Sequence, residues 1–280
     1  MILVFGATGT IGDELISILS GDGVPALAVT RGGVPEHARP GIRWVRADLS
    51  APASIKGLFA GVKSIFLLTG NHPDMARLQI TAIDAAARAG VEHVVKLSAL
   101  GASDHSKLPI GRAHYEAEAA LIASRMRWTI FRPHVFMQNL LAQAPGIVHE
   151  GRIVGASGDG RIPFIDTRDI AACAAVALTR AGHDGQKYIL TGPEALSYYD
   201  IARILTEIIG RPVEYHDRFD EGRDRNTLAA HQRAGGKTAI VHDTVRRILG
   251  RGPRSFAEFA RDHADIFRGT GDKRPFEVSS

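Results

Sequence analysis

The sequence predicts an α/β protein with a doubly wound parallel sheet, followed by a smaller, mostly helical lobe. Short apolar segments alternate with helical patterns over residues 1–193, which is the order of strands and crossover helices in a parallel sheet. The first four of these segments are short and mainly apolar, as expected for strands covered on both faces. After Gly192-Pro193 the pattern is mainly helical. We therefore predict a first domain over residues 1–193 and a smaller lobe over residues 194–280.

Each element follows from an apolar run and its breaks. Strands are expected where short apolar runs lie between polar, glycine or proline breaks, at residues 1–5, 25–30, 42–47, 64–69, 92–98, 127–132 and 186–190. Helices are expected where apolar residues recur at helical spacing, at residues 13–19, 73–90, 111–124, 166–179, 197–209, 244–249 and 255–267. The glycine-rich residues 151–160 predict a turn, and the composition of residues 269–280 predicts disorder.

Composition excludes several classes of protein. A chain of 280 residues that is 45% hydrophobic can bury a substantial core. No apolar run is long enough for a membrane span, and a first strand at Met1 leaves no room for a signal peptide, so we expect a cytoplasmic protein. The net charge of +4 is dispersed, which argues against nucleic-acid binding. A monomer or a homodimer is expected.

Metal and disulfide chemistry are also unexpected. Cys173 is the only cysteine, so neither a disulfide framework nor a thiolate metal site can form within the chain. The twelve histidines show no His-Glu-x-x-His or comparable ligand spacing. We expect no metal.

The first strand leads directly into a glycine-rich turn and a helix start. In a dinucleotide-binding turn the first glycine allows the tight bend, the second lets the main chain approach a pyrophosphate, and the third lets the helix pack on the strand. Free amides at the helix start then bind the phosphates. We predict a Rossmann-type NAD(P) site whose phosphate loop comprises Gly6, Thr8, Gly9, Thr10, Ile11 and Gly12.

The residue after the second strand indicates which dinucleotide binds. NAD sites often place a carboxylate there, whereas NADP sites place an arginine nearby. Here the position holds Arg31, whose planar fork of donors suits a phosphate, so NADPH is preferred over NADH. The alternative is a solvated loop arginine. Asp48, after the third strand, either accepts from the adenine amino group or caps a loop or the helix after Pro52.

Further cofactor contacts are expected where later strands end. Thr69 and Gly70 follow the fourth strand and would border the ribose or the pyrophosphate, although a plain strand-to-helix turn is the alternative. Ser98 and Pro133 end the fifth and sixth strands. Open sheets bind their ligands at this edge.

The segment after the sixth strand mixes apolar groups with amide donors. Residues 133–139 therefore predict a substrate pocket beside the nicotinamide. Phe136 and Asn139 are the substrate-binding candidates.

These motifs resemble the NmrA-like family, an atypical branch of the extended short-chain dehydrogenase/reductases that includes dye reductases, quinone reductases and cofactor-sensing regulators. The resemblance covers nearly the whole chain. It depends mainly on Gly-Ala-Thr-Gly-x-x-Gly at 6–12 and on Trp-Thr-Ile-Phe-Arg-Pro at 128–133 followed by Phe-Met-Gln-Asn at 136–139, with support from the segments 94–102, 114–118, 166–171 and 255–259.

The resemblance implies catalytic residues that are only partly present. In short-chain reductases a tyrosine transfers the proton, a lysine four residues later lowers its pKa, and a serine stands at an earlier strand end. Ser98 stands at such a strand end, but Tyr115 is followed at that distance by Ala119, so the usual acid/base pair is incomplete.

Two other residues are candidates for the missing role. His114 and Glu118 match the family's atypical signature and lie one helical turn apart, so the carboxylate would raise the imidazole pKa. A simple pair on the helix surface is the alternative. Lys96 shares a strand face with Ser98 and either replaces the missing lysine or extends its amine outward to solvent. The catalytic candidates are thus His114, Ser98 and Tyr115.

We therefore expect an NADPH-dependent oxidoreductase that transfers hydride to a small, electron-poor aromatic or conjugated substrate such as a quinone or a dye. Such a product takes its proton from water, so positioning and solvent exclusion supply most of the rate. The alternative is a non-enzymatic regulator that senses NADP(H). The missing lysine favours this alternative. A sugar-nucleotide epimerase is the least supported, because it depends on the same tyrosine and lysine.

Overall fold

The computed structural model describes residues 1–34, 39–218 and 239–270. The chain forms two compact units. The first contains residues 1–133 and 170–189, and the described part of the second contains residues 134–169, 190–218 and 239–270. Residues 134–169 thus belong to the second unit, although they precede the boundary that we expected after residue 193. The chain leaves the sheet after its sixth strand and returns to it with the last one, so the units do not follow chain order.

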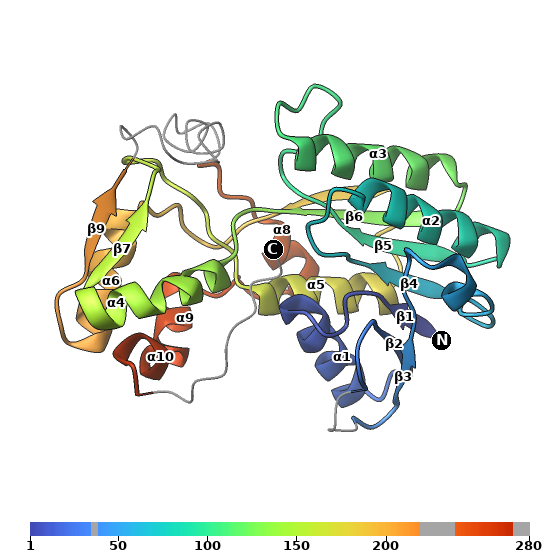
Figure 1. The fold of residues 1–280 in the computed structure, drawn as a ribbon, viewed down its shortest axis with the longest axis horizontal. Helices are drawn as coiled ribbons and strands as arrows, with labels where there is room; N and C mark the ends of the chain where they lie inside the picture. Colours follow the sequence, from blue (N-terminus) through green and yellow to red (C-terminus); the bar gives the residue numbers. More distant parts are fainter. Residues whose placement is uncertain (35–38, 219–238, 271–280) are drawn as a thin grey trace. The chain divides into compact units, whose positions relative to one another are not determined.

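The first unit is built on a seven-stranded sheet in the order β3-β2-β1-β4-β5-β6-β8 (Figure 1). The registered pairs from β3 to β6 are all parallel. This is the doubly wound Rossmann order, and the predicted fold class is confirmed. The strands are β1 (Ile2–Val4), β2 (Ala26–Thr30), β3 (Ile42–Arg46), β4 (Ser64–Leu67), β5 (His93–Leu97), β6 (Arg127–Pro133) and β8 (Gln186–Leu190).

Helices cover both faces of this sheet. Figure 1 shows α2 and α3 on one face and α1 on the other. Alternate strand residues, among them Leu3, Leu27 and Ile65, pack with Ile83 of α2 and Leu121 of α3 in one buried apolar cluster. The helical elements are α1 (Thr10–Gly21), η1 (Pro52–Ile55), α2 (Met75–Arg88), α3 (Pro109–Ala123) and α5 (Thr167–Thr179), the last of which begins in the second unit.

The second unit is helical with a small sheet of its own. Its elements are η2 (Met137–Gln143), α4 (Ala144–Glu150), β7 (Arg152–Gly155), α6 (Tyr198–Ile209), β9 (Glu214–Asp217), α8 (Thr244–Leu249), α9 (Phe256–Asp262) and α10 (Ala264–Arg268). Its apolar cluster includes Phe164, Leu205, Phe256 and Phe267.

The sequence missed the two strands of this small sheet. β7 and β9 pair in parallel, with Ile153 opposite Tyr215. β7 lies in the glycine-rich stretch that predicted a turn, and β9 reads Glu-Tyr-His-Asp, so neither has a long apolar run. Their strand character depends on pairing between distant segments, which local pattern does not contain.

The expected helix over residues 255–267 is in fact two helices. His263 ends α9 with a φ of −112°, and its ring nitrogen Nδ1 lies 2.8 Å from the carbonyl oxygen of Phe259. The His263 amide donates to the same carbonyl oxygen at 3.2 Å, so α9 closes at this residue and α10 begins at the next. The final residues 271–280, for which disorder was predicted, lie outside the described residues. Within the described ranges, no helix combines the length and the apolar character needed to cross a membrane.

Candidate active site

The predicted cofactor residues of the first unit stand at one edge of the sheet. Parallel strands place their carboxyl ends on the same side. Chain order reverses between β1 and the adjacent β4, and open α/β sheets bind ligands at this switch point. The residues that follow or end strands there are Gly6, Arg31, Asp48, Thr69, Gly70, Ser98 and Pro133.

The glycine turn has the close approaches that a phosphate-binding turn requires. Gly6 has a φ of +70°, and a Cβ there would lie 2.9 Å from the carbonyl oxygen of Leu68. A Cβ on Gly12 would lie only 2.0 Å from the carbonyl oxygen of Gly6. By contrast, a Cβ on Gly9 would meet only that same oxygen, at 3.4 Å. Gly6 and Gly12 are therefore needed for packing within the turn, while Gly9 lies on a more open side.

The start of α1 presents main-chain amides at this edge. Gly9 is the N-cap residue in an extended conformation, and no side chain caps the helix. The first amides of a helix have no partner within it, so they suit an anion. Thr8 and Thr10 are exposed beside them, whereas Ile11 is buried. Asp13 in the first turn would oppose an anion, but Arg39 binds its carboxylate at 2.8 and 3.0 Å.

Arg31 is exposed immediately after β2. Asp48 accepts hydrogen bonds from the Ser50 amide and hydroxyl, both at 2.8 Å. These bonds, followed by the nearby charge of Arg31, lower the pKa of Asp48. Asp48 therefore caps its own loop through Oδ1, and Arg31 lies close enough to influence its carboxylate. Its contact with adenine stays a prediction.

A buried polar cluster lies under α3, at the ends of β5 and β6. We call Lys96, Ser98, His114, Glu118 and Arg132 the α3 cluster. Ser98 Oγ donates to Glu118 Oε1 at 2.5 Å. Arg132 donates to both oxygens of the same carboxylate, at 2.9 and 2.6 Å. Lys96 Nζ donates to the Leu97 carbonyl oxygen at 3.1 Å and lies 3.3 Å from His114 Nδ1.

The cluster departs from three expectations for these residues. His114 and Glu118 are both buried, so they are not a helix surface pair. Burial and then the charge of Lys96 lower the pKa of His114 to about 3, although Glu118 opposes this, whereas we expected the imidazole pKa to rise. Lys96 is fully buried and does not extend its amine to solvent.

Glu118 is a carboxylate held by its hydrogen-bond donors. Burial raises its pKa, but hydrogen bonds from Arg132 and Ser98 lower it by more. Lys187, whose amine lies 3.4 Å from Oε2, adds a second positive charge. Because Ser98 gives its hydroxyl proton to Glu118, its oxygen can only accept a bond from a ligand.

Lys96 should make stability depend on pH. Burial lowers its pKa from 10.5 to about 7, so the unfolded chain binds more protons than the folded one between these values. Stability therefore rises with pH in that window, and we expect a gain of about 2 kcal/mol from pH 7 to pH 9. In Lys96→Met this gain disappears when unfolding is measured with denaturant at both pH values. Lys63→Met, at an exposed lysine, serves as control and keeps the gain; equal slopes in all three proteins would contradict the assignment.

Tyr115 lies half-buried on α3. The position four residues later holds Ala119, which is exposed, so the tyrosine has no lysine there.

The substrate candidates belong to the second unit. Phe136 is half-buried and forms an isolated parallel bridge with Ile165, and Asn139 is exposed at the start of η2. Between them, Gln138 is buried and donates to Asp166 Oδ1 at 2.8 Å.

Two aspartates bind partners at the start of α5. Asp166 Oδ1 accepts from the amide of Arg168 at 2.9 Å, which caps α5. Asp169 lies in the first turn and accepts from the amide and the guanidinium of Arg254, at 2.7 and 2.8 Å.

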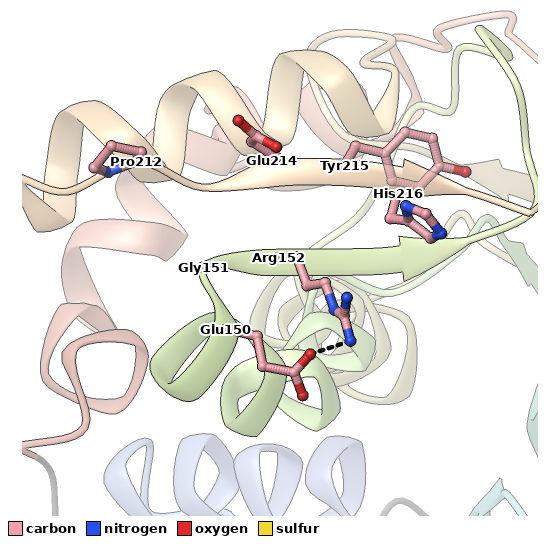
Figure 2. Close-up of a pocket in the computed structure, with 7 residues that line it drawn as sticks. All are labelled: Glu150, Gly151, Arg152, Pro212, Glu214, Tyr215 and His216. Atoms are coloured by element: carbon pink, nitrogen blue, oxygen red, sulfur yellow. Dashed lines mark ion pairs between the residues drawn. The ribbon is translucent and has the colours of Figure 1, made fainter.

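A hollow of about 400 Å³ lies beside β7 and β9 (Figure 2). Glu150 and Arg152 form an ion pair on one side of it, with Glu214 and His216 on the other strand. These four side chains are exposed, so a ligand there would remain largely in water. It contains none of the predicted cofactor or substrate residues, and we assign it no function.

Sequence reasoning missed Arg132 and Gln79 as parts of the polar interior, and the exposed Lys187 as an ion-pair partner of Glu118. Arg132 lay within a quoted motif, but its partner could not be read from it. Gln79 is a polar residue at a core-facing position of α2, between Met75 and Ile83, and this position is the signal that could have revealed it.

Comparison with known proteins agrees with this architecture. The sequence model described as the NmrA-like family matches residues 1–219. The NAD(P)H azoreductase of Xenophilus azovorans is 36% identical, over 95% of this chain and 99% of that protein. The (4-alkanoyl-5-oxo-2,5-dihydrofuran-3-yl)methyl phosphate reductase of Streptomyces griseus is 33% identical, over 95% and 99%. An NADPH-dependent quinone oxidoreductase of Escherichia coli, solved with NADPH, superimposes with a TM-score of 0.82 at 28% identity, covering 94% of this chain and 99% of that one. The chain belongs to the NmrA-like family.

Proposed function

We propose that this protein is an NADPH-dependent reductase that transfers hydride directly to a small, conjugated, electron-poor substrate. The observation that carries the proposal is the glycine turn at the switch point, where Gly6 and Gly12 bring the start of α1 against β1. This geometry suits the pyrophosphate of a dinucleotide. The first unit would bind the cofactor through this turn. Phe136 and Asn139 stay our proposed substrate-binding residues.

The relatives support the class of substrate. Their names describe an azo compound, a quinone and an unsaturated oxo-dihydrofuran phosphate. All three are conjugated systems that accept hydride at an electron-poor position. The common requirement is orientation of the acceptor against the nicotinamide and exclusion of water.

The source of the proton is the second part of the proposal. Of the three catalytic candidates, Ser98 gives its proton to Glu118 and His114 is kept neutral beside Lys96. Tyr115 is half-buried and retains access to solvent. We propose that the product anion takes its proton from water or from Tyr115, and that Ser98 and His114 act by position.

The test combines binding and turnover. Purified protein is titrated with NADPH in a calorimeter, and NADPH absorbance is then followed with a panel of quinones, azo compounds and triarylmethane dyes. Turnover of at least one panel class is expected. Binding without turnover would support an NADP(H) sensor instead. Ala119, which stands where the short-chain reductases have a lysine, favours that alternative. Absence of binding would refute both.

Arg31→Asp should change cofactor preference. Loss of the guanidinium and gain of a negative charge are expected to weaken NADPH by at least about 10-fold, while NADH, which lacks the 2′-phosphate, changes little. The control is Arg43→Asp, which introduces the same charge on an exposed residue near the start of β3, away from the carboxyl ends of the strands. Equal weakening of both cofactors would remove Arg31 from the phosphate site.

A further inference from the structure

A glutamine is buried behind the switch point, in a position that the proposed mechanism does not use. Gln79 of α2 is 0% exposed. Its Nε2 donates to Thr69 Oγ1 at 2.9 Å. Thr69 stands two residues beyond the end of β4, next to the β1 edge that carries the glycine turn.

The direction of this bond determines what the threonine can do. A hydroxyl has one proton and two acceptor sites. Since Thr69 Oγ1 accepts from Gln79, its own proton remains available for another oxygen. Thr69 also follows Leu68, whose carbonyl oxygen is the atom that Gly6 approaches, so the hydroxyl belongs to the same corner as the phosphate loop.

A second observation concerns the other end of the glutamine amide. Among the described residues, Gln79 Oε1 is buried without a hydrogen-bond partner. Reversing the amide would leave Nε2 in the same state, so either orientation leaves one polar atom without a protein partner. Buried polar atoms of this kind are uncommon, and sites for ligands and ordered water account for many of them.

We propose that Gln79 is a positioning residue of the dinucleotide site, which holds the Thr69 hydroxyl as a hydrogen-bond donor to a pyrophosphate oxygen of the cofactor. This inference depends on the proposed NADPH binding and adds to it a residue that does not touch the cofactor. A hydroxyl that is free to rotate loses this rotational freedom when it binds a ligand, which weakens binding. A hydroxyl fixed by Gln79 is already oriented and avoids this cost.

A double-mutant cycle on the NADPH dissociation constant tests the proposal. Thr69→Val removes the donor, and Gln79→Leu removes the group that orients it. Each is expected to weaken NADPH by about 10-fold, the usual effect of one hydrogen bond to a charged group. Because both changes remove the same contact, Gln79→Leu with Thr69→Val should also weaken it by about 10-fold rather than about 100-fold. The KM for NADPH should rise while kcat at saturating NADPH stays unchanged.

Two further variants separate positioning from folding. Gln79→Glu places a carboxylate that accepts the Thr69 proton, so NADPH affinity should be lower at neutral pH and recover as the pH falls and the carboxyl becomes a donor. Thr81→Val is the control, since this α2 threonine donates to the Arg77 carbonyl oxygen instead. It should leave the dissociation constant unchanged.

Specific results would overturn the inference. An unchanged dissociation constant in Gln79→Leu that folds with wild-type thermal stability would do so, as would additive losses near 100-fold in the double variant. If the wild-type protein itself binds no NADPH, the proposed function fails as well. The two failures are therefore distinguishable.

Discussion

Gly12→Ala is expected to disrupt both folding stability and NADPH binding. The new Cβ would lie 2.0 Å from the carbonyl oxygen of Gly6 and 2.7 Å from the Cα of Ala7. These are backbone atoms, which cannot rotate away, so α1 has to move off β1. We expect a loss of about 3 kcal/mol in unfolding free energy, the upper range for overpacking. If two amides then lose the phosphate, affinity falls on the order of 100-fold.

The same helix provides a matched control. Gly21 is the last residue of α1, and a Cβ there would meet nothing within 4 Å. Gly21→Ala should therefore stabilise the protein by about 0.5–1 kcal/mol, because alanine loses less backbone entropy in a helix. Chemical denaturation and calorimetry measure both variants. Wild-type stability and affinity in Gly12→Ala would show that α1 does not pack against the turn as described.

Glu118→Ala should cause the largest loss of stability in the α3 cluster. Glu118 is 1% exposed and binds Ser98 and Arg132 through three hydrogen bonds. Its removal leaves the Arg132 guanidinium, with only 21% of its side chain exposed, without its carboxylate. Breaking a buried pair from one side costs about 3–5 kcal/mol, and the partial exposure of Arg132 favours the lower end, about 3 kcal/mol.

A neighbour on α3 provides the comparison. Glu116 is exposed, and Glu116→Ala should change the free energy of unfolding by no more than about 0.5 kcal/mol. If both variants change the free energy of unfolding by a similar amount, the Glu118–Arg132 pair does not stabilise the protein as described.

Glu118 also predicts an acid dependence. Because its pKa is lowered in the folded protein, the unfolded chain takes up the proton first as the pH falls below about 4.3. The stability that Glu118 contributes is therefore complete at neutral pH and is lost in acid. Glu118→Gln should reduce this loss when unfolding is followed from pH 6 to pH 3. A wild-type acid response in that variant would contradict the assignment.

The sheet and its phosphate loop could be predicted from local sequence. All seven strands of the first unit were expected, because each is a short segment with apolar residues and a break in the pattern near its ends. The roles of Gly6 and Gly12 were also expected, since a tight turn and a close helix contact require residues without a Cβ. Both inferences use interactions among residues close in the chain.

The polar interior could not be predicted in this way. His114 and Glu118 are one turn apart on α3, which suggested a pair, yet Arg132 and Ser98 bind the carboxylate and Lys96 faces the imidazole. These partners lie in or directly after β5 and β6, which are distant from α3 in the sequence or separated from it by a loop. β7 and β9 were missed for the same reason, because they become strands through each other.

The sequence by itself determined the doubly wound sheet, the position of the phosphate loop and the family, because apolar periodicity and glycine spacing act over a few residues. Tertiary structure alone decided how the charges are paired, that Ser98 gives its proton to Glu118, that Gln79 is buried against Thr69, and that Lys96 is buried. The physical reason is that burial and hydrogen-bond partners are set by segments that meet only after folding, and the pKa values of the polar interior depend on both.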